Sequence, residues 1–131
     1  MYSPAGARQK DISTRLIKPT LSDIDIPKLF SAVNHWDNAW EYDASIGVYD
    51  EGILQYSLTT EEAHLKFYAA LILGKPSLRC HLTPNEPENV LDEQAGNIIT
   101  LKNASELTAD DCEKLIKLKE ILERRGYRFA N

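Results

Sequence analysis

The spacing of apolar residues changes period several times along this chain, and that alternation restricts the folds that the chain can adopt. Segments with helical spacing are separated by segments in which apolar residues recur at every second position, as in a strand. In order, the sequence predicts a helix after Asp25, a hairpin within 46–58, a helix over 60–73, strands at 77–82 and 97–102, and a helix after Thr108. This order, α-β-β-α-β-β-α, with or without a final strand at 127–129, indicates an α+β fold in which a small, mostly antiparallel sheet of about four strands packs with three helices.

The first predicted helix and the hairpin that follows it carry their own boundary signals. Pro27 suits the first turn of a helix, where no backbone N–H is needed. A single apolar stripe then continues along the helix at Leu29, Val33, Trp36 and Trp40. In the hairpin, residues 50–52 form the predicted connection, and Gly52 supplies the left-handed conformation that a tight turn needs.

The helix predicted over 60–73 has a start signal, an end signal and a histidine on its apolar face. Thr59 and Glu62 have the spacing of a capping box, and Gly74 ends the helix. Its apolar stripe consists of His64, Phe67, Tyr68 and Leu71. We therefore expect His64 to pack at the edge of the core, although Glu61-x-x-His64 has the spacing of one half of a di-iron motif.

The last helix has the most complete set of helix signals. Thr108 is the predicted N-cap, Leu107 before it can pack on Cys112, and Gly126 ends the helix. The apolar positions cover more than half of the helix circumference: Cys112, Leu115, Ile116, Leu118, Ile121 and Leu122. A face this wide predicts either deep packing in the fold or an interface, including a homodimer formed through this helix.

A length of 131 residues predicts one domain. Residues 1–21 lack periodicity and are predicted to be a mobile or loosely docked arm, with residues 22–131 as a single globular α+β domain. The longest apolar run, 67–73, is far shorter than the ~20 residues of a membrane helix, so we expect no membrane partner. Cys80 and Cys112 are expected to be small buried residues in a reducing, cytoplasmic setting.

Few residues of the chain are arranged as in a known catalytic or metal site. A zinc site built from His35, His64, His81 and a cysteine lacks the short ligand spacings that such sites use. The sequence contains no nucleophile elbow and no phosphate-binding loop, and its six glycines are scattered. We therefore expect no catalytic residue, no metal and no cofactor, with an enzyme whose residues meet only in the folded protein as the open alternative.

Charge is strongly segregated along the chain, although the net charge is only -5. Residues 41–113 carry 14 acidic and 4 basic groups. Residues 1–20 carry four basic groups and one acidic group, and residues 114–131 carry six basic and two acidic groups. The acidic middle of the chain would steer a partner with a basic surface toward it.

Nucleic acid is an unlikely partner for a chain with this charge pattern, because nonspecific affinity for it comes from neutralising phosphates. On the last helix, Glu113 and Glu120 share a face with Lys117 and Arg124. A cluster of aromatic and acidic residues instead predicts a protein-binding surface. Its members are Trp40, Glu41, Tyr42, Asp43, Tyr49, Asp50 and Glu51.

Size, acidity and the lack of recognisable chemistry point to a binding protein. A loosely similar order of elements occurs in small acidic secretion chaperones and in immunity and antitoxin proteins. We expect a cytoplasmic inhibitor protein, immunity- or antitoxin-like, whose acidic surface occupies a basic partner such as a toxin or nuclease. A chaperone for a secreted protein and a small enzyme with a dispersed active site are the alternatives.

Overall fold

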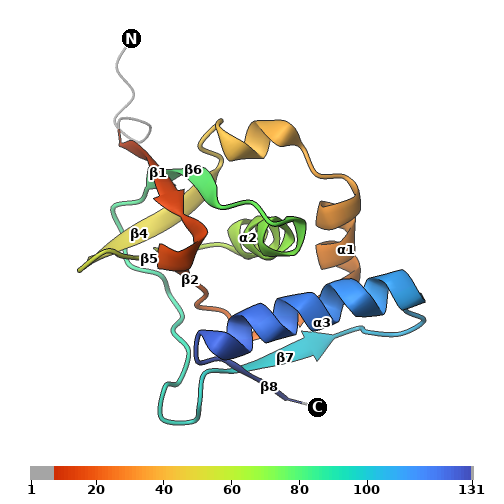
Figure 1. The fold of residues 1–131 in the computed structure, drawn as a ribbon. Coiled ribbons are helices and arrows are strands. Elements are labelled where there is room, and N and C mark those ends of the chain that lie inside the picture. Colours follow the sequence, from red (N-terminus) through yellow and green to blue (C-terminus); the bar gives the residue numbers. More distant parts are fainter. Residues whose placement is uncertain (1–7, 131) are drawn as a thin grey trace.

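The computed structural model describes residues 8–130, which form three α-helices, two short 3-10 helices and eight strands (Figure 1). In chain order the elements are β1 (Gln9–Ser13), η1 (Thr14–Leu16), β2 (Ile17–Lys18), β3 (Asp23–Asp25), α1 (Ile26–Asn34), η2 (Asn38–Glu41), β4 (Ile46–Gly52), β5 (Gln55–Leu58), α2 (Glu61–Leu73), β6 (Ser77–Leu82), β7 (Ile98–Lys102), α3 (Ala109–Arg124) and β8 (Arg128–Ala130).

The strands form two sheets of different type. Sheet A has five strands in the order β1-β6-β4-β5-β2, and sheet B has three in the order β3-β7-β8. Sheet A is mixed, since β1-β6 and β4-β5 are antiparallel while β6-β4 and β5-β2 are parallel. Both pairs in sheet B are parallel. The α+β class is confirmed, but the prediction of one mostly antiparallel sheet of about four strands is wrong, and the predicted order lacks β1, β2 and β3.

Helix α2 forms the centre of the core. Figure 1 shows it end-on, between sheet A, α1 and α3. Its buried residues lie all around its circumference: Ala63, His64, Lys66, Phe67, Tyr68, Ala69, Ala70, Leu71 and Ile72. Burial on every side is typical of a helix inside a core. Side chains of sheet A, among them Ile12, Ile46 and Leu58, are buried as well.

Within the segment predicted to be a mobile or loosely docked arm, residues 9–13 and 17–18 are strands of sheet A, joined by η1. β1 pairs with β6, and β2 pairs with β5. Ile12 and Ile17, one from each strand, are buried. Strands this short contain too few positions for a periodic pattern, so pairing with their neighbours determines their conformation. Residues 1–7 of the predicted arm lie outside the described residues.

Helix α1 ends earlier than its apolar stripe predicts. Pro27 lies in its first turn, as expected, but the helix stops at Asn34. The side chain of Asp37 then accepts a hydrogen bond from the Ala39 N–H and caps η2. Asp side chains favour such local hydrogen bonds to the backbone, which compete with the continuation of a helix. Trp36 and Trp40 therefore lie outside α1, and their rings pack edge to face with centroids 5.0 Å apart.

The β4–β5 hairpin turns at Ile53 and Leu54, and the prediction of a turn at residues 50–52 is wrong. Gly52 pairs with Gln55, which leaves Ile53 and Leu54 as a two-residue loop. Both loop residues have positive φ, 54° and 56°, as in a type I′ turn. Such turns favour Asn and Gly, so two apolar residues carry no turn signal in the sequence.

The caps of α2 and α3 agree with the sequence in part. The Thr60 hydroxyl accepts a hydrogen bond from the Ala63 N–H and caps α2, so the predicted capping box at Thr59 is wrong. Gly74 adopts a left-handed conformation and ends α2 as expected. Thr108 caps α3 as expected.

The apolar face of α3 is narrower than its sequence predicts. Leu115, Leu118 and Leu122 are buried against the rest of the core. Ile116 is 55% exposed. Cys112 is also exposed, so the prediction that it is a small buried residue is wrong. Only one face of α3 packs against the core, and Ile116 and Cys112 lie outside that face.

Candidate functional site

His64 is held inside the core by hydrogen bonds to backbone groups. Its Nε2 accepts hydrogen bonds from the N–H groups of Thr20 (2.8 Å) and Leu21 (3.2 Å), and its Nδ1 donates to the carbonyl of Thr60 (2.6 Å). Burial lowers the pKa of His64 to about 4, against the opposing effects of the Thr60 carbonyl and Glu61. The neutral ring therefore joins α2 to the segment before β3, with both nitrogens occupied.

The other candidate ligands of a metal site are also held apart by the fold. Within residues 8–130, no group of three or more His, Cys, Asp and Glu side chains is placed to hold a metal ion. Glu61 forms an ion pair with Lys28 at 3.3 Å. The Nδ1 of His81 lies 2.7 Å from the carbonyl oxygen of Ala44. Burial raises the pKa of the Cys80 thiol to about 12, which keeps it protonated.

The seven residues of the predicted partner-binding surface fall into two groups at opposite ends of β4. Residues 40–43 belong to η2 and the turn that precedes the strand, whereas residues 49–51 lie toward the far end of the strand. The extended stretch from Ile46 to Asp50 alone spans roughly 13 Å. The two groups are therefore separated by the length of the strand, which the sequence distance did not reveal.

Trp40 and Glu41 are engaged in contacts within the fold. The Glu41 carboxylate pairs with Lys75 at 3.1 Å and accepts a hydrogen bond from the Trp36 indole, and these two contacts lower its pKa. The Lys66 ammonium lies over the Trp40 ring, 4.9 Å from its centroid. These contacts attach η2 to the body of the protein, and they leave less of this charge and ring surface for a partner.

Tyr42 and Asp43 are the exposed residues of the group at η2. Tyr42 is 70% exposed. One carboxylate oxygen of Asp43 accepts a hydrogen bond from the Ser45 N–H at 2.9 Å, which is a local turn contact. Of the four predicted residues at this end of β4, Tyr42 and Asp43 therefore offer the most surface to a partner.

The group at the far end of β4 lies on a hairpin that projects from sheet A (Figure 1). Tyr49 is half-buried, and Asp50 and Glu51 are exposed. The two residues of the turn, Ile53 and Leu54, are 97% and 66% exposed; we call them the hairpin tip. The sequence did not reveal the hairpin tip as a surface feature, because apolar residues next to a strand are read as core residues.

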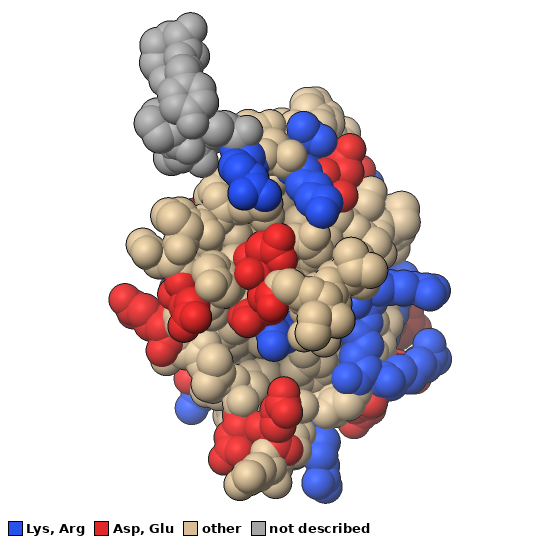
Figure 2. Space-filling view, turned by 90° about the vertical axis from the view of Figure 1, so that its left-hand side faces the viewer, with Lys and Arg blue, Asp and Glu red and all other residues tan. Residues whose placement is uncertain are grey.

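The charges that are segregated along the sequence remain partly segregated on the surface. In the face that Figure 2 shows, Lys and Arg side chains gather mainly at the right-hand edge and near the top. Asp and Glu side chains are spread over the centre and the lower part of the same face. Acidic and basic partners would therefore approach different parts of the molecule.

No helix of residues 8–130 combines the length and the apolar composition that crossing a membrane requires. Comparison of the chain with protein-family models, with curated proteins and with solved structures finds no match.

Proposed function

We propose that this protein is a non-catalytic binding protein that recognises a basic protein partner through the β4–β5 hairpin. In this proposal the hairpin tip enters an apolar depression on the partner, and Asp50 and Glu51 contact cationic side chains around that depression. A toxin or nuclease with a basic active surface is the kind of partner that fits. By binding to that surface, the present protein would inhibit the partner. The observation that most strongly supports this proposal is that two exposed apolar residues, Ile53 and Leu54, both have positive φ.

The conformation of the hairpin tip is unfavourable for apolar residues. A left-handed conformation costs an L-residue roughly 1–2 kcal/mol, and a β-branched residue such as Ile53 is rarely found in it. Asn and Gly adopt the same turn with little strain. Exposed side chains also gain little from burial, so fold stability does not account for Ile53 and Leu54. Strained residues of this kind cluster at sites of function.

The surroundings of the hairpin tip are those of a binding hot spot. Apolar anchors at the centre of an interface supply most of its affinity, and charged residues around them govern the approach of the partner. The base of the hairpin is supported on both sides, since β4 pairs with β6 over residues 46–48 and β5 pairs with β2 at Tyr56 and Ser57. The Ser57 hydroxyl donates to Glu51, and the Gly52 N–H donates to Asp50 at 2.8 Å. A supported hairpin loses little conformational entropy when it binds.

Partner capture tests the proposal with one double substitution and one matched control. Ile53→Asn/Leu54→Gly keeps a two-residue turn and removes both apolar anchors. Val90→Asn removes an apolar side chain that is 78% exposed in the loop before β7. We expect immobilised wild-type protein to retain a basic protein from a lysate of the source cells, and the Val90 variant to retain it equally. The double variant should bind it at least about tenfold more weakly.

Two results of this experiment would contradict the proposal. One is retention of the same protein by Ile53→Asn/Leu54→Gly with undiminished affinity. The other is a retained partner that carries no excess of Lys and Arg, because Asp50 and Glu51 would then have no charge to recognise.

A further inference from the structure

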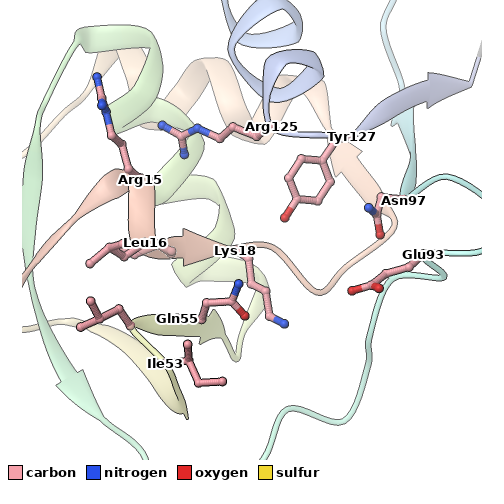
Figure 3. A pocket seen from close by; sticks show the side chains of 11 residues that line it. Arg15, Leu16, Lys18, Ile53, Gln55, Glu93, Asn97, Arg125 and Tyr127 are labelled. Carbon is pink, nitrogen blue, oxygen red and sulfur yellow. The ribbon is translucent and has the colours of Figure 1, made fainter.

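A polar pocket of about 440 Å³ lies beside the hairpin tip (Figure 3). It is lined by η1 and β2, the hairpin tip, the loop before β7 and the segment that follows α3. Its charged side chains are Arg15, Lys18, Arg125 and Glu93, and its uncharged polar side chains are Gln55, Asn97 and Tyr127. Three cations and one carboxylate give the pocket a positive charge.

The two basic ends of the chain meet at this pocket. Arg15 and Lys18 belong to the basic N-terminal segment, and Arg125 belongs to the basic C-terminal segment. The Nη1 of Arg125 donates a hydrogen bond to the carbonyl oxygen of Thr14 at 2.9 Å. Charge that is divided between the ends of the sequence is therefore concentrated at one place in the fold.

The cations of the pocket have no acidic partner among residues 8–130. Six basic side chains of the fold form ion pairs within 4.0 Å, but Arg15, Lys18 and Arg125 are not among them. Burial lowers the pKa of Arg125; Tyr127 opposes this shift, and the charge of Arg15 adds to it. Like charges that are held together in excess of the nearby carboxylate favour the binding of an anion.

An adjoining pocket of about 540 Å³ is a weaker candidate for an anion site. Its basic residues are Arg15, Lys75, Arg124 and Arg125. Gly74, the C-cap of α2, lines the adjoining pocket and not the first one, and the carbonyl groups at a helix C-terminus attract cations and repel anions. Lys75 and Arg124 are also paired already, with Glu41 and Glu120. The unpaired basic residues of the adjoining pocket are therefore Arg15 and Arg125, which also line the pocket beside the hairpin tip.

We propose that the pocket beside the hairpin tip binds a small phosphate monoester whose organic part carries hydroxyl groups, such as a sugar phosphate. The guanidinium groups of Arg15 and Arg125 lie near one another at one end of the pocket, where they suit phosphate oxygens, and Lys18 adds positive charge from the side nearer Glu93 (Figure 3). Glu93 lies on the opposite side of the pocket (Figure 3), where its carboxylate accepts hydrogen bonds from hydroxyl groups and disfavours a second anionic group. A volume of about 440 Å³ is within the range of small-molecule sites.

The phosphate site is independent of the proposed protein partner, although the two surfaces meet at the hairpin tip. Asp50 and Glu51 do not line the pocket. Reversing both of these charges should therefore impair partner capture and leave phosphate binding within about twofold of the wild-type value. Loss of partner capture therefore tests the protein-binding surface, and loss of phosphate binding tests the pocket.

Isothermal titration calorimetry at low chloride tests the site with ribose 5-phosphate, inorganic phosphate and ribose. We expect saturable binding of ribose 5-phosphate, weaker binding of inorganic phosphate and no binding of ribose. Arg15→Ala should weaken the binding of ribose 5-phosphate by roughly tenfold or more, because a charge-assisted contact is lost. Arg79→Ala removes the same charge from β6, outside the pocket, and should change the affinity by less than about twofold.

Two further variants separate binding from folding and assign the two sides of the pocket. Arg125→Lys keeps a charge that can still donate to the Thr14 carbonyl, but it lacks the planar fork and should bind ribose 5-phosphate several times more weakly. Glu93→Gln should weaken ribose 5-phosphate and leave inorganic phosphate bound at least as tightly as before.

Three outcomes would overturn this inference. The first is the absence of saturable binding of ribose 5-phosphate up to about 10 mM. The second is an Arg15→Ala variant that binds as tightly as the wild-type protein. The third is a short single-stranded oligonucleotide that binds more than about tenfold tighter than ribose 5-phosphate, because the natural ligand would then be a nucleic-acid backbone.

Discussion

At the scale of single residues, His64 makes hydrogen bonds that only the neutral form of its ring can make. A protonated Nε2 cannot accept hydrogen bonds from the N–H groups of Thr20 and Leu21. In the folded protein these two hydrogen bonds fix the segment before β3. Burial is the main reason that the folded protein keeps the pKa of His64 at about 4, below its ordinary value of 6.5. The histidine therefore ties the stability of this segment to pH.

We predict that the free energy of unfolding decreases as the pH falls from about 6.5 to about 4. In this range the unfolded chain binds a proton at His64 and the folded chain does not, so protonation favours unfolding. The contribution of His64 is complete above pH 6.5, and its loss by pH 4 amounts to roughly 3 kcal/mol. Urea unfolding across this range measures it.

His64→Gln is the control for the pH measurement. Glutamine can accept a backbone N–H but does not titrate, so the variant should cost about 1–2 kcal/mol at pH 7 and should lose most of the pH dependence between 6.5 and 5. Asp and Glu side chains also titrate below pH 5 and add to the pH dependence there. The slope of the unfolding free energy between pH 6.5 and 5 is therefore the part that reports on His64. The same slope in the variant and the wild-type protein would assign the pH dependence to other groups.

At the scale of elements, α3 has a covered face and an exposed face. Leu118 and Leu122 are fully buried, whereas Ile116 is largely exposed. The width of the apolar stripe in the sequence therefore overstates the part of the helix that belongs to the core.

We predict that Leu118→Ala and Leu122→Ala each lower the free energy of unfolding by about 2–5 kcal/mol, because each leaves a cavity in the core. Ile116→Ala should lower it by less than about 1 kcal/mol. Chemical unfolding measures both effects, and sedimentation of the same variants reports association. A wild-type dimer that Ile116→Ala dissociates would assign the exposed face to an interface and not to solvent.

The elements that could be predicted from the sequence are those with local signals. Thr108, Gly74 and Pro27 mark helix ends by their own chemistry, and the strand at residues 77–82 has the predicted bounds. β1, β2 and β3 each have a single buried position, so neighbouring strands rather than local periodicity determine them. The hairpin turn was misplaced because Ile53 and Leu54 are not the residues that a type I′ turn favours.

At the scale of the whole molecule, folding separates some charges and unites others. Residues 40–43 and 49–51 are close in sequence but lie at opposite ends of β4. Arg15 and Arg125 are far apart in sequence but line the same pocket. The charges of the candidate sites could therefore be identified from the sequence, but their grouping could not, because it depends on tertiary packing.

We predict that Asp50→Lys/Glu51→Lys slows association with the basic partner by roughly tenfold or more at low salt, with a smaller effect at high salt. Both residues are exposed, so the variant should remain folded. Asp43→Lys, at the other end of β4, is the control and should have a much smaller effect. Association rates of the captured partner measured at several salt concentrations test this. A rate that does not depend on salt would place the interface elsewhere.

The free energy of unfolding of Ile53→Asn/Leu54→Gly tests most directly whether the hairpin tip is shaped for binding and not for folding. Asn-Gly suits a type I′ turn, and the two side chains that it replaces are mostly exposed. We predict that the variant is more stable than the wild-type protein in urea by roughly 1–2 kcal/mol, while it loses the partner. A variant of equal or lower stability would contradict this, because the apolar pair would then contribute to the fold itself.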